Sequence, residues 1–345
     1  MADLVPQPLV MVGEGWGDFA LLDSGHGRKL ERYGPWRFIR PEPQAMWSPR
    51  LPESAWDADG EFVPGSDEDG GGRWVFAREV PGEGWPTAWR DVRFTAQCTP
   101  FRHLGFFPDM APVWDWMRGM LAGKALSGVD SGSSSSNPAP GTGPLPLPAT
   151  QQDNALGGRE GERAGAAPDR QVGQRGTLNL FGYTGVGTLA LSECGPVTHV
   201  DASKKSVAQA QVNAALSGME DRPIRWLIDD AAKFTAREVR RERRYDGIIL
   251  DPPKFGRGPK NETWRIEEGL PALAADCRKL LDQDSRFLFL TAYAVRMSSL
   301  ALGGLLAETF ADLPGTIECG ELALREEGEG GRLLPTAIFA RWNNG

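Results

Sequence analysis

The chain has 345 residues and a formal net charge of −8 at pH 7, and 40% of its residues are hydrophobic and 24% charged. This composition is typical of a soluble globular protein, and the length allows two domains. No apolar stretch approaches the roughly 18–20 residues that a membrane-spanning helix requires, and the acidic charge counts against a general nucleic-acid binder.

Residues 1–126 are rich in tryptophan and in turn-forming residues. Nine of the twelve tryptophans fall here, separated by short apolar runs and many Gly and Pro residues. This pattern predicts a small β-rich domain with long loops, and residues 66–72 predict a hairpin tip or exposed loop. The segment from Met1 to Pro6 lacks the features of a secretory signal, so we expect a cytoplasmic protein.

Residues 127–176 have a different composition. They include Gly-Ser-Ser-Ser-Ser-Asn at 132–137 and Pro-Leu-Pro-Leu-Pro at 144–148, and they contain no aromatic residue. Such a segment cannot bury enough apolar area to compensate for the entropy lost on ordering. We therefore predict a disordered insert between two folded regions.

From residue 177 onward, strand-type and helix-type patterns alternate. This alternation predicts an α/β domain over 177–345 with a doubly wound, mostly parallel sheet. The predicted strands are 177–181, 197–201, 224–228, 245–250, 286–291, 316–324 and 336–342. The predicted helices are 186–192, 204–216, 231–243, 264–281 and 298–310.

The fourth of these strands ends in an unusual way. The buried run from Gly247 to Leu250 is followed by Asp251, Pro252 and Pro253. Prolines cannot continue a sheet ladder, and they push the preceding acid toward an extended backbone. Residues 251–253 therefore form a stiff segment, which we call the proline ledge, at the carboxyl end of a strand. Ligands bind at this edge of open α/β sheets. The alternative is a strand followed by a simple proline turn.

The first strand runs into a glycine-rich turn. Gly182, Gly185 and Gly187 have GxxGxG spacing, which differs from the GxGxxG of dinucleotide sites. Asp201 ends the second strand nineteen residues after Gly182, where an acid can accept hydrogen bonds from ribose hydroxyls. The glycines could bring the backbone close to a ligand, or could simply allow close helix–strand packing.

The third strand ends at Asp229 and Asp230. Asp230 could face an adenine amino group, or it could only cap the following helix. Acids at successive strand ends suit a cofactor that carries a ribose, an adenine and a cationic sulfonium. They do not suit a pyrophosphate.

These motifs resemble those of class I S-adenosylmethionine (SAM)-dependent methyltransferases. More closely, they resemble the bacterial 23S rRNA (cytosine carbon-5) methyltransferase-related group. The resemblance extends upstream over residues 21–25, 28–34 and 39–44, and over 103–109 within a segment near 101–117 that would cover the cofactor. It implies a Rossmann-like, seven-stranded methyltransferase domain preceded by a small β-rich domain.

The resemblance also implies roles for individual residues. Gly182 and Gly185 would lie against the methionine moiety, Asp201 would bind the ribose, and Asp230 would bind the adenine amine. The implied catalytic residues are Asp251, Pro252 and Lys254, and no metal site is implied. The implied contacts to SAM are Phe107, Asn179, Phe181, Gly182, Tyr183, Thr184, Gly185, Asp201, Ala202, Ser203, Asp229, Asp230 and Asp251.

The chain departs from this group in its cysteines. Carbon-5 enzymes of the group place a nucleophilic Cys near the end of the fifth strand, where this chain has Leu-Thr-Ala-Tyr at 290–293. Thiolate attack on the ring is needed to activate carbon-5. Cys277 and Cys319 are expected to be structural, and the wide spacing of all four cysteines argues against a zinc site. A covalent carbon-5 mechanism is therefore in doubt, and the long insert is a second departure.

The expected function is SAM-dependent methyl transfer to a base nitrogen or carbon of RNA, most consistent with ribosomal RNA processing and without a membrane partner. Lys254, Arg257 and Lys260 could bind phosphates, or could belong to a solvated loop. The arginine-rich run at 237–244 could contact phosphates, but such runs are more often a solvated last helical turn. Two other functions stay open: a non-catalytic RNA-binding or assembly factor on a methyltransferase fold, and an NAD-dependent oxidoreductase.

Overall fold

The computed structural model describes residues 3–4, 7–65, 71–100, 102–123, 175–258 and 262–345. The predicted insert over 127–176 lies outside the described residues except at 175 and 176. Lys260 and most of the predicted 66–72 loop also lie outside them.

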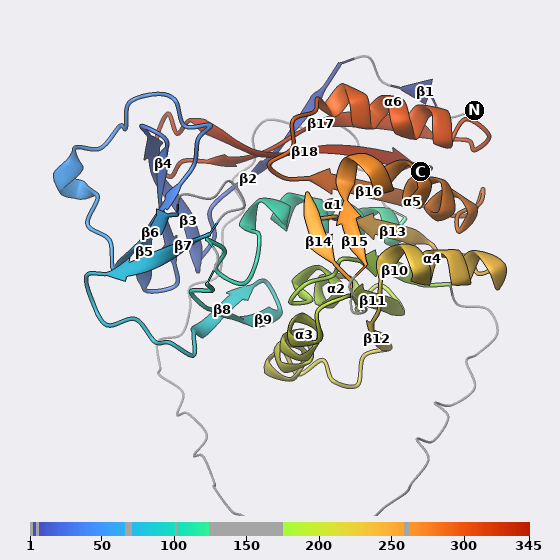
Figure 1. Cartoon of the computed structure of the whole chain (residues 1–345), viewed down its shortest axis with the longest axis horizontal. Helices are drawn as coiled ribbons and strands as arrows, with labels where there is room; N and C mark the ends of the chain where they lie inside the picture. Colours follow the sequence, from blue (N-terminus) through green and yellow to red (C-terminus); the bar gives the residue numbers. More distant parts are fainter. Residues whose placement is uncertain (1–2, 5–6, 66–70, 101, 124–174, 259–261) are drawn as a thin grey trace, which may run out of the picture. The chain divides into compact units, whose positions relative to one another are not determined.

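The main sheet contains nine strands among the described residues, in the order β1-β17-β18-β16-β13-β10-β11-β12, with β2 also pairing with β17 (Figure 1). β18 runs antiparallel to β16 and β17, whereas the other pairs are parallel. The strands are β1 Asp3–Leu4, β2 Leu9–Gly13, β10 Thr177–Leu180, β11 Val197–Asp201, β12 Ile224–Ile228, β13 Gly247–Leu250, β16 Phe287–Ala292, β17 Thr316–Arg325 and β18 Leu333–Asn343. All seven predicted strands are present.

Helices cover both faces of this sheet, as the predicted α/β class requires. Because side chains alternate along a strand, Ile248 and Leu250 join one core cluster while Ile249 joins the other. The first cluster includes side chains of α4, α5 and α6, and the second includes those of α1 and α2. The helices are α1 Ala111–Leu121, α2 Val186–Leu191, α3 Lys204–Leu216, α4 Ala231–Arg240, α5 Ile266–Lys279 and α6 Ser299–Thr309.

The N-terminal region is β-rich, as predicted. Its five-stranded sheet has the order β3-β4-β5-β6-β7, and a separate hairpin pairs β8 with β9. The elements are β3 Phe19–Gly25, β4 Arg28–Tyr33, β5 Trp36–Pro41, β6 Gly60–Pro64, β7 Gly72–Phe76, β8 Trp85–Trp89 and β9 Val92–Ala96, with 3₁₀ turns η1 Glu53–Ala55 and η2 Pro108–Met110. The described residues before 124 and after 174 form one compact unit, and the division into domains stays a prediction.

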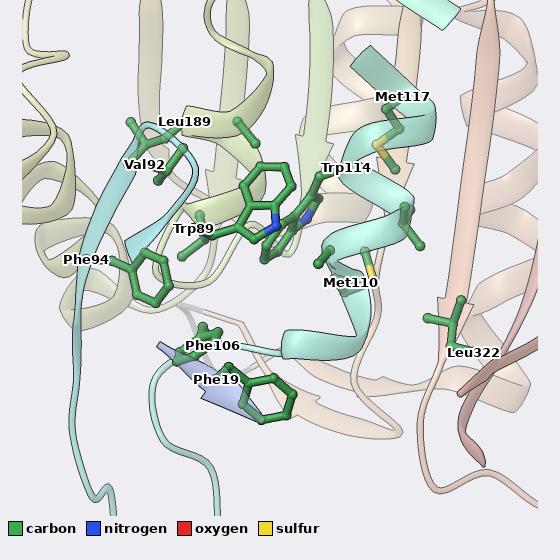
Figure 2. Close-up of a cluster of buried hydrophobic side chains, with 14 of the residues drawn as sticks. Phe19, Trp89, Val92, Phe94, Phe106, Met110, Trp114, Met117, Leu189 and Leu322 are labelled. Carbon is green, nitrogen blue, oxygen red and sulfur yellow. The ribbon is translucent and has the colours of Figure 1, made fainter. Parts of the chain in front are cut away.

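Helix α1 links the two regions through a buried aromatic cluster. Figure 2 shows Trp114 of α1 beside Trp89 of the β8–β9 hairpin, with Phe106 and Leu189 nearby. The two indole rings meet edge to face with centroids 5.0 Å apart. Such aromatic pairs contribute about 0.5–1.5 kcal/mol beyond the burial of their apolar area. This packing fixes the segment that precedes α1 against the region that begins at β10.

A second link is a buried polar network. Ser24 Oγ on β3 donates to Glu326 Oε1 just after β17 at 2.6 Å, and Arg332 Nη2 donates to Asp23 Oδ1 at 3.0 Å. Asp23 also accepts hydrogen bonds from Leu51 N and Trp56 Nε1, both at 2.9 Å. Burial alone would favour the neutral acid, but these hydrogen bonds outweigh it and lower the pKa of Asp23.

The structure corrects two boundaries around the proline ledge. Trp264 lies in a strand rather than at the start of a helix, because β14 Phe255–Arg257 pairs with β15 Thr263–Arg265 before α5 begins. The indole Nε1 donates to the Pro253 carbonyl at 2.7 Å, which holds this hairpin against the ledge. The short strands β1 and β2, which extend the main sheet beyond β17, were also not predicted.

Replacing Asp23 by Asn should lower the free energy of unfolding by about 2–3 kcal/mol, since a hydrogen-bonded buried charge is lost. The pKa of Asp23 is lowered on folding, so its stabilisation is present above about pH 4 and is lost as the pH falls through the folded-state value. Urea unfolding at pH 7 and at about pH 3 measures both effects.

The matched control is Asp57→Asn, since Asp57 forms an ion pair with Arg78 in which both side chains are at least half exposed. Such pairs contribute about 0–1 kcal/mol. Equal stability of Asp23→Asn and the wild type at pH 7 would contradict the structural role of this network.

Candidate methyl-transfer site

The glycine-rich turn after β10 has a left-handed backbone at several positions. Phe181, Tyr183 and Gly185 have φ values of 59°, 49° and 80°. A Cβ on Gly185 would also lie 2.7 Å from the Ala210 Cβ. Glycine is therefore required at 185 both for its backbone conformation and for packing against α3.

Gly182 is required for a different reason. A Cβ at this position would lie 2.4 Å from the His199 ring. Asn179 Nδ2 donates to Thr188 Oγ1 at 2.8 Å, and this hydroxyl lies 2.9 Å from His199 Nδ1. Burial lowers the pKa of His199 to about 3, so the imidazole is neutral. Close packing thus explains why residue 182 is a glycine. The hydrogen bond from the Asn179 amide to Thr188 connects the end of β10 to α2, on either side of the turn.

Asp201 holds the turn and the next helix together. Its carboxylate accepts hydrogen bonds from Tyr183 N at 2.9 Å and Ser203 N at 2.8 Å. Burial raises the pKa of Asp201, while these two hydrogen bonds act in the opposite direction. Ser203 Oγ in turn caps α3 by accepting from Ser206 N at 3.1 Å, and Ala202 lies half-buried between the two.

The acids after β12 anchor helix α4. Asp230 Oδ1 caps the helix by accepting from Lys233 N at 2.9 Å, and Asp229 forms an ion pair with Arg237. The capping alternative for Asp230 is therefore observed for one carboxylate oxygen. Ile228, which sequence reasoning missed, leaves 47% of its side chain exposed next to these acids and offers an apolar surface.

Asp251 is the most perturbed acid of the candidate site. Burial raises its pKa to about 6, the nearby charge of Asp109 acts in the same direction, and a hydrogen bond from Thr291 Oγ1 lowers it. Thr291 lies in the 290–293 segment, which contains no cysteine. The sequence alone did not pair these residues, because they are 40 positions apart.

The rest of the ledge combines buried and exposed groups. Pro252 is buried, and no described residue donates a hydrogen bond to its carbonyl. Lys254 is exposed where the chain enters β14, while its carbonyl accepts from Ile266 N at 3.1 Å. The structure thus places Lys254 at the surface rather than against Asp251.

The segment before α1 lies against the glycine turn. Thr184 Oγ1 donates to the Gly105 carbonyl at 2.6 Å. The Phe107 ring is 5.8 Å from Tyr183 and 5.1 Å from Tyr293, measured between centroids. Phe107 therefore connects the turn after β10 to the loop after β16.

Two cavities meet at Phe106 and Phe107. The smaller one has a volume of about 50 Å³ and is lined by Asn179, residues 181–187 and Asp251. The larger one has a volume of about 460 Å³ and lies toward β4, β5 and the loop after β16. Asp201 and Ile228 lie outside the lining of both cavities.

The cysteines are not arranged for nucleophilic chemistry. Cys277 and Cys319 are buried, and burial raises the pKa of every cysteine, that of Cys98 to about 12. Raised values disfavour the reactive thiolate. Within the described part of the chain, no three His, Cys, Asp or Glu side chains are grouped to hold a metal ion, and no helix is long and apolar enough to span a membrane.

Three of the five arginines in the run at 237–244 form ion pairs. This favours the reading of a solvated helix end over that of a free phosphate-binding patch. The pairs are Arg237–Asp229, Arg241–Glu238 at 3.0 Å and Arg244–Asp282 at 4.0 Å.

Replacing Gly182 by Ala should lower the free energy of unfolding by about 1–3 kcal/mol, because the added methyl group overlaps the His199 ring. Gly304 on α6 is the control, since a Cβ there meets nothing within 4 Å. Gly304→Ala should be neutral or stabilising by up to about 1 kcal/mol. Denaturant unfolding compares the two, and an unchanged stability of Gly182→Ala would refute the packing account.

Comparison with known proteins gives a consistent picture. No model of a known protein family matches the chain. A solved SAM-dependent methyltransferase from Agrobacterium tumefaciens is similar to it, with a TM-score of 0.80, 36% identity and coverage of 100% of this chain and 96% of that one.

Curated relatives match over shorter segments. Ribosomal RNA large subunit methyltransferase I of Klebsiella pneumoniae is 32% identical over 26% of this chain and 23% of that protein. Ribosomal RNA large subunit methyltransferase K/L of Shewanella baltica is 32% identical over 35% of this chain and 18% of that protein. The chain thus spans about a quarter or less of the length of these relatives.

The ends of β11 and β12 lie next to the glycine-rich turn. Asp201 pairs with Ile228 in the β11–β12 ladder, and its carboxylate joins the left-handed turn at 181–185 through Tyr183 N. The strand order and the match to the Agrobacterium protein over nearly all of both chains point to the same family. They leave no support for the NAD-dependent alternative. The chain belongs to the SAM-dependent methyltransferases.

Proposed function

We propose that this protein methylates a base of RNA, and that its substrate is ribosomal RNA. The observation that carries the proposal is the Asp251 carboxyl group, which lines the smaller cavity and whose burial raises its pKa to about 6. The partial matches to ribosomal RNA methyltransferases support the substrate class. A cytoplasmic location follows from that substrate.

The proposed contacts to SAM lie on the β10–β12 side of the sheet. Asp201 would bind the ribose hydroxyls, Ile228 would contact the adenine ring, and Asp230 would reach the adenine amine with the oxygen that does not cap α4. The turn from Phe181 to Gly185 would lie along the methionine moiety, covered by Phe107. When bound, SAM supplies an electrophilic methyl group on a sulfonium.

The chain's own groups would orient the acceptor. The ionised Asp251 carboxylate can accept a hydrogen bond from an exocyclic amine, and the Pro252 carbonyl can accept a second one. Together they would fix a planar amine-bearing ring, and positioning is the main requirement of an in-line methyl transfer. Since no cysteine lines either cavity, a base nitrogen is the favoured acceptor over carbon-5.

The β14–β15 hairpin offers a surface for RNA next to the ledge. Phe255 is 48% exposed, and the Arg265 guanidinium lies over its ring at 5.7 Å. Lys254 and Arg257 are exposed on the same hairpin. Aromatic stacking and phosphate contacts of this kind support single-stranded RNA binding, despite the net charge of −8.

Transfer of tritiated methyl groups from SAM to ribosomal RNA from a strain lacking the protein tests this function, with nucleoside mass spectrometry to identify the product. Asp251→Asn should reduce kcat by about a hundredfold or more, because the acceptor loses its orienting carboxylate. Absence of transfer by the wild type would favour the non-catalytic assembly factor instead.

The pH dependence tests the role of Asp251 separately. Because the ionised carboxylate accepts the amine hydrogen bond more strongly than the neutral acid does, kcat/KM should rise with pH and level off above about pH 6. The Thr291 hydroxyl lowers the pKa of Asp251, so Thr291→Val should move this inflection to higher pH while activity at high pH is retained. An inflection that Thr291→Val leaves in place would contradict the assignment.

A further inference from the structure

The larger cavity shares Phe106 and Phe107 with the smaller one, and Phe107 is the one proposed SAM contact in its lining. Its walls come from β4 and β5, from residues 102–109, from the loop after β16 and from the facing parts of β17 and β18. The proposed contacts to SAM lie mainly on β10, β11 and β12. The cavity is therefore placed to receive the methyl acceptor. Its volume of about 460 Å³ falls within the usual range for small-ligand sites.

One cation of this cavity lacks an ion-pair partner. Lys29 pairs with Glu42 at 3.1 Å, and Arg40 pairs with Glu31 at 2.7 Å. No described residue forms an ion pair or hydrogen bond with the Arg102 guanidinium, although the side chain is half-buried. A partly buried guanidinium without a partner is suited to an anion, which it can bind with two parallel hydrogen bonds.

A second polar group at the cavity, the Tyr293 hydroxyl, has only a poorly aligned partner among the described residues. The Tyr293 hydroxyl is buried and has no hydrogen bond of acceptable geometry within the described part of the chain, although it faces the Asp109 carboxyl group. Nearly all buried polar groups in proteins are well hydrogen-bonded, so a hydroxyl whose only partner, among the described residues, is a poorly aligned carboxyl group is suited to a second partner from a ligand. Asp109 itself is 3% exposed and accepts from Thr336 Oγ1 at 2.6 Å.

The wall between the two cavities is aromatic. The Phe107 ring is 5.1 Å from both Tyr293 and His103, measured between centroids. Burial and the nearby arginines keep the pKa of His103 at about 3, so this ring is neutral. A flat, uncharged surface next to a guanidinium suits a planar ring that carries an anionic group.

We propose that this cavity binds one nucleotide of the acceptor RNA, with its phosphate on Arg102 and its base against Phe107 and Tyr293. The inference rests on the proposed function and deepens it. The nucleotide must leave the base stack to enter, as in other enzymes that modify bases. The hydroxyl of Tyr293 would then hydrogen-bond to the base or ribose.

Saturation-transfer NMR with the four nucleoside 5′-monophosphates and the corresponding nucleosides tests the cavity directly. The protein is held with S-adenosylhomocysteine (SAH), the product left by SAM. At least one monophosphate should bind more tightly than its nucleoside. Arg102→Gln should lower the affinity for that monophosphate by about tenfold to a hundredfold and leave the affinity for the nucleoside unchanged. Tyr293→Phe should weaken binding by about two- to tenfold.

Arg222→Gln is the matched control, because Arg222 is exposed and lies outside the cavity lining. Each variant is first checked for SAH affinity by calorimetry, which also reports on folding. The proposal is overturned if no monophosphate binds the wild type, or if Arg102→Gln binds it equally well. It is also overturned if Arg102→Gln loses SAH affinity, since Arg102 would then hold the methionine carboxylate.

The two proposals fail in different ways. If a monophosphate binds through Arg102 but no RNA is methylated, the proposed function is refuted and the assignment of the cavity to a nucleotide is supported. RNA methylation with the same KM for RNA in Arg102→Gln and the wild type would keep the function and remove the cavity assignment.

Discussion

Burial of the Asp251 carboxyl group at the end of β13 is the interaction on which the rest of the site depends. The four residues of this strand are all buried, and the two prolines that follow prevent the sheet from continuing. The acid is thus held where water is scarce, which raises its pKa to about 6. The hydrogen bond from the Thr291 hydroxyl lowers the pKa of Asp251 and so limits this rise. A carboxyl group tuned in this way can change its charge near neutral pH.

The segment from Leu104 to Met110 gives this acid its surroundings. It lies between the glycine turn and the loop after β16, and it contributes both Phe107 and Asp109. The edge-to-face contact of Trp89 and Trp114 fixes the helix that follows, as Figure 2 shows. The β-rich region therefore does more than precede the methyltransferase domain, because it supplies one wall of the larger cavity.

The main sheet and the acids at its strand ends could be predicted from the sequence, because they depend on local patterns. Short apolar runs separated by helix-type patterns predicted the seven strands. Asp201 ends β11, and Asp251 directly follows β13. Side-chain partners that are distant in the chain left no such pattern. The hydrogen bond from Thr291 to Asp251 and the approach of Asp109 depend on how strands and loops pack in space.

Three further features of the structure could not be predicted from the sequence, each for a physical reason. The β14–β15 hairpin is short, and its Trp264 continues the helical pattern of α5, so the helix was predicted to begin too early. Gly182 was read mainly as a ligand contact, whereas the structure shows that the His199 ring leaves no room for a side chain. That no described residue pairs with the Arg102 guanidinium could not be recognised from the sequence, because it depends on the neighbours that folding brings together.

SAM and the acceptor nucleotide are thus assigned to different places, SAM to the strand ends and turn beside the smaller cavity and the nucleotide to the larger cavity. A crystal structure of the protein with SAH tests this assignment most directly. The account predicts the ribose on Asp201, the methionine moiety along residues 181–185, and the larger cavity free of SAH. SAH in the larger cavity, with its carboxylate on Arg102, would contradict it.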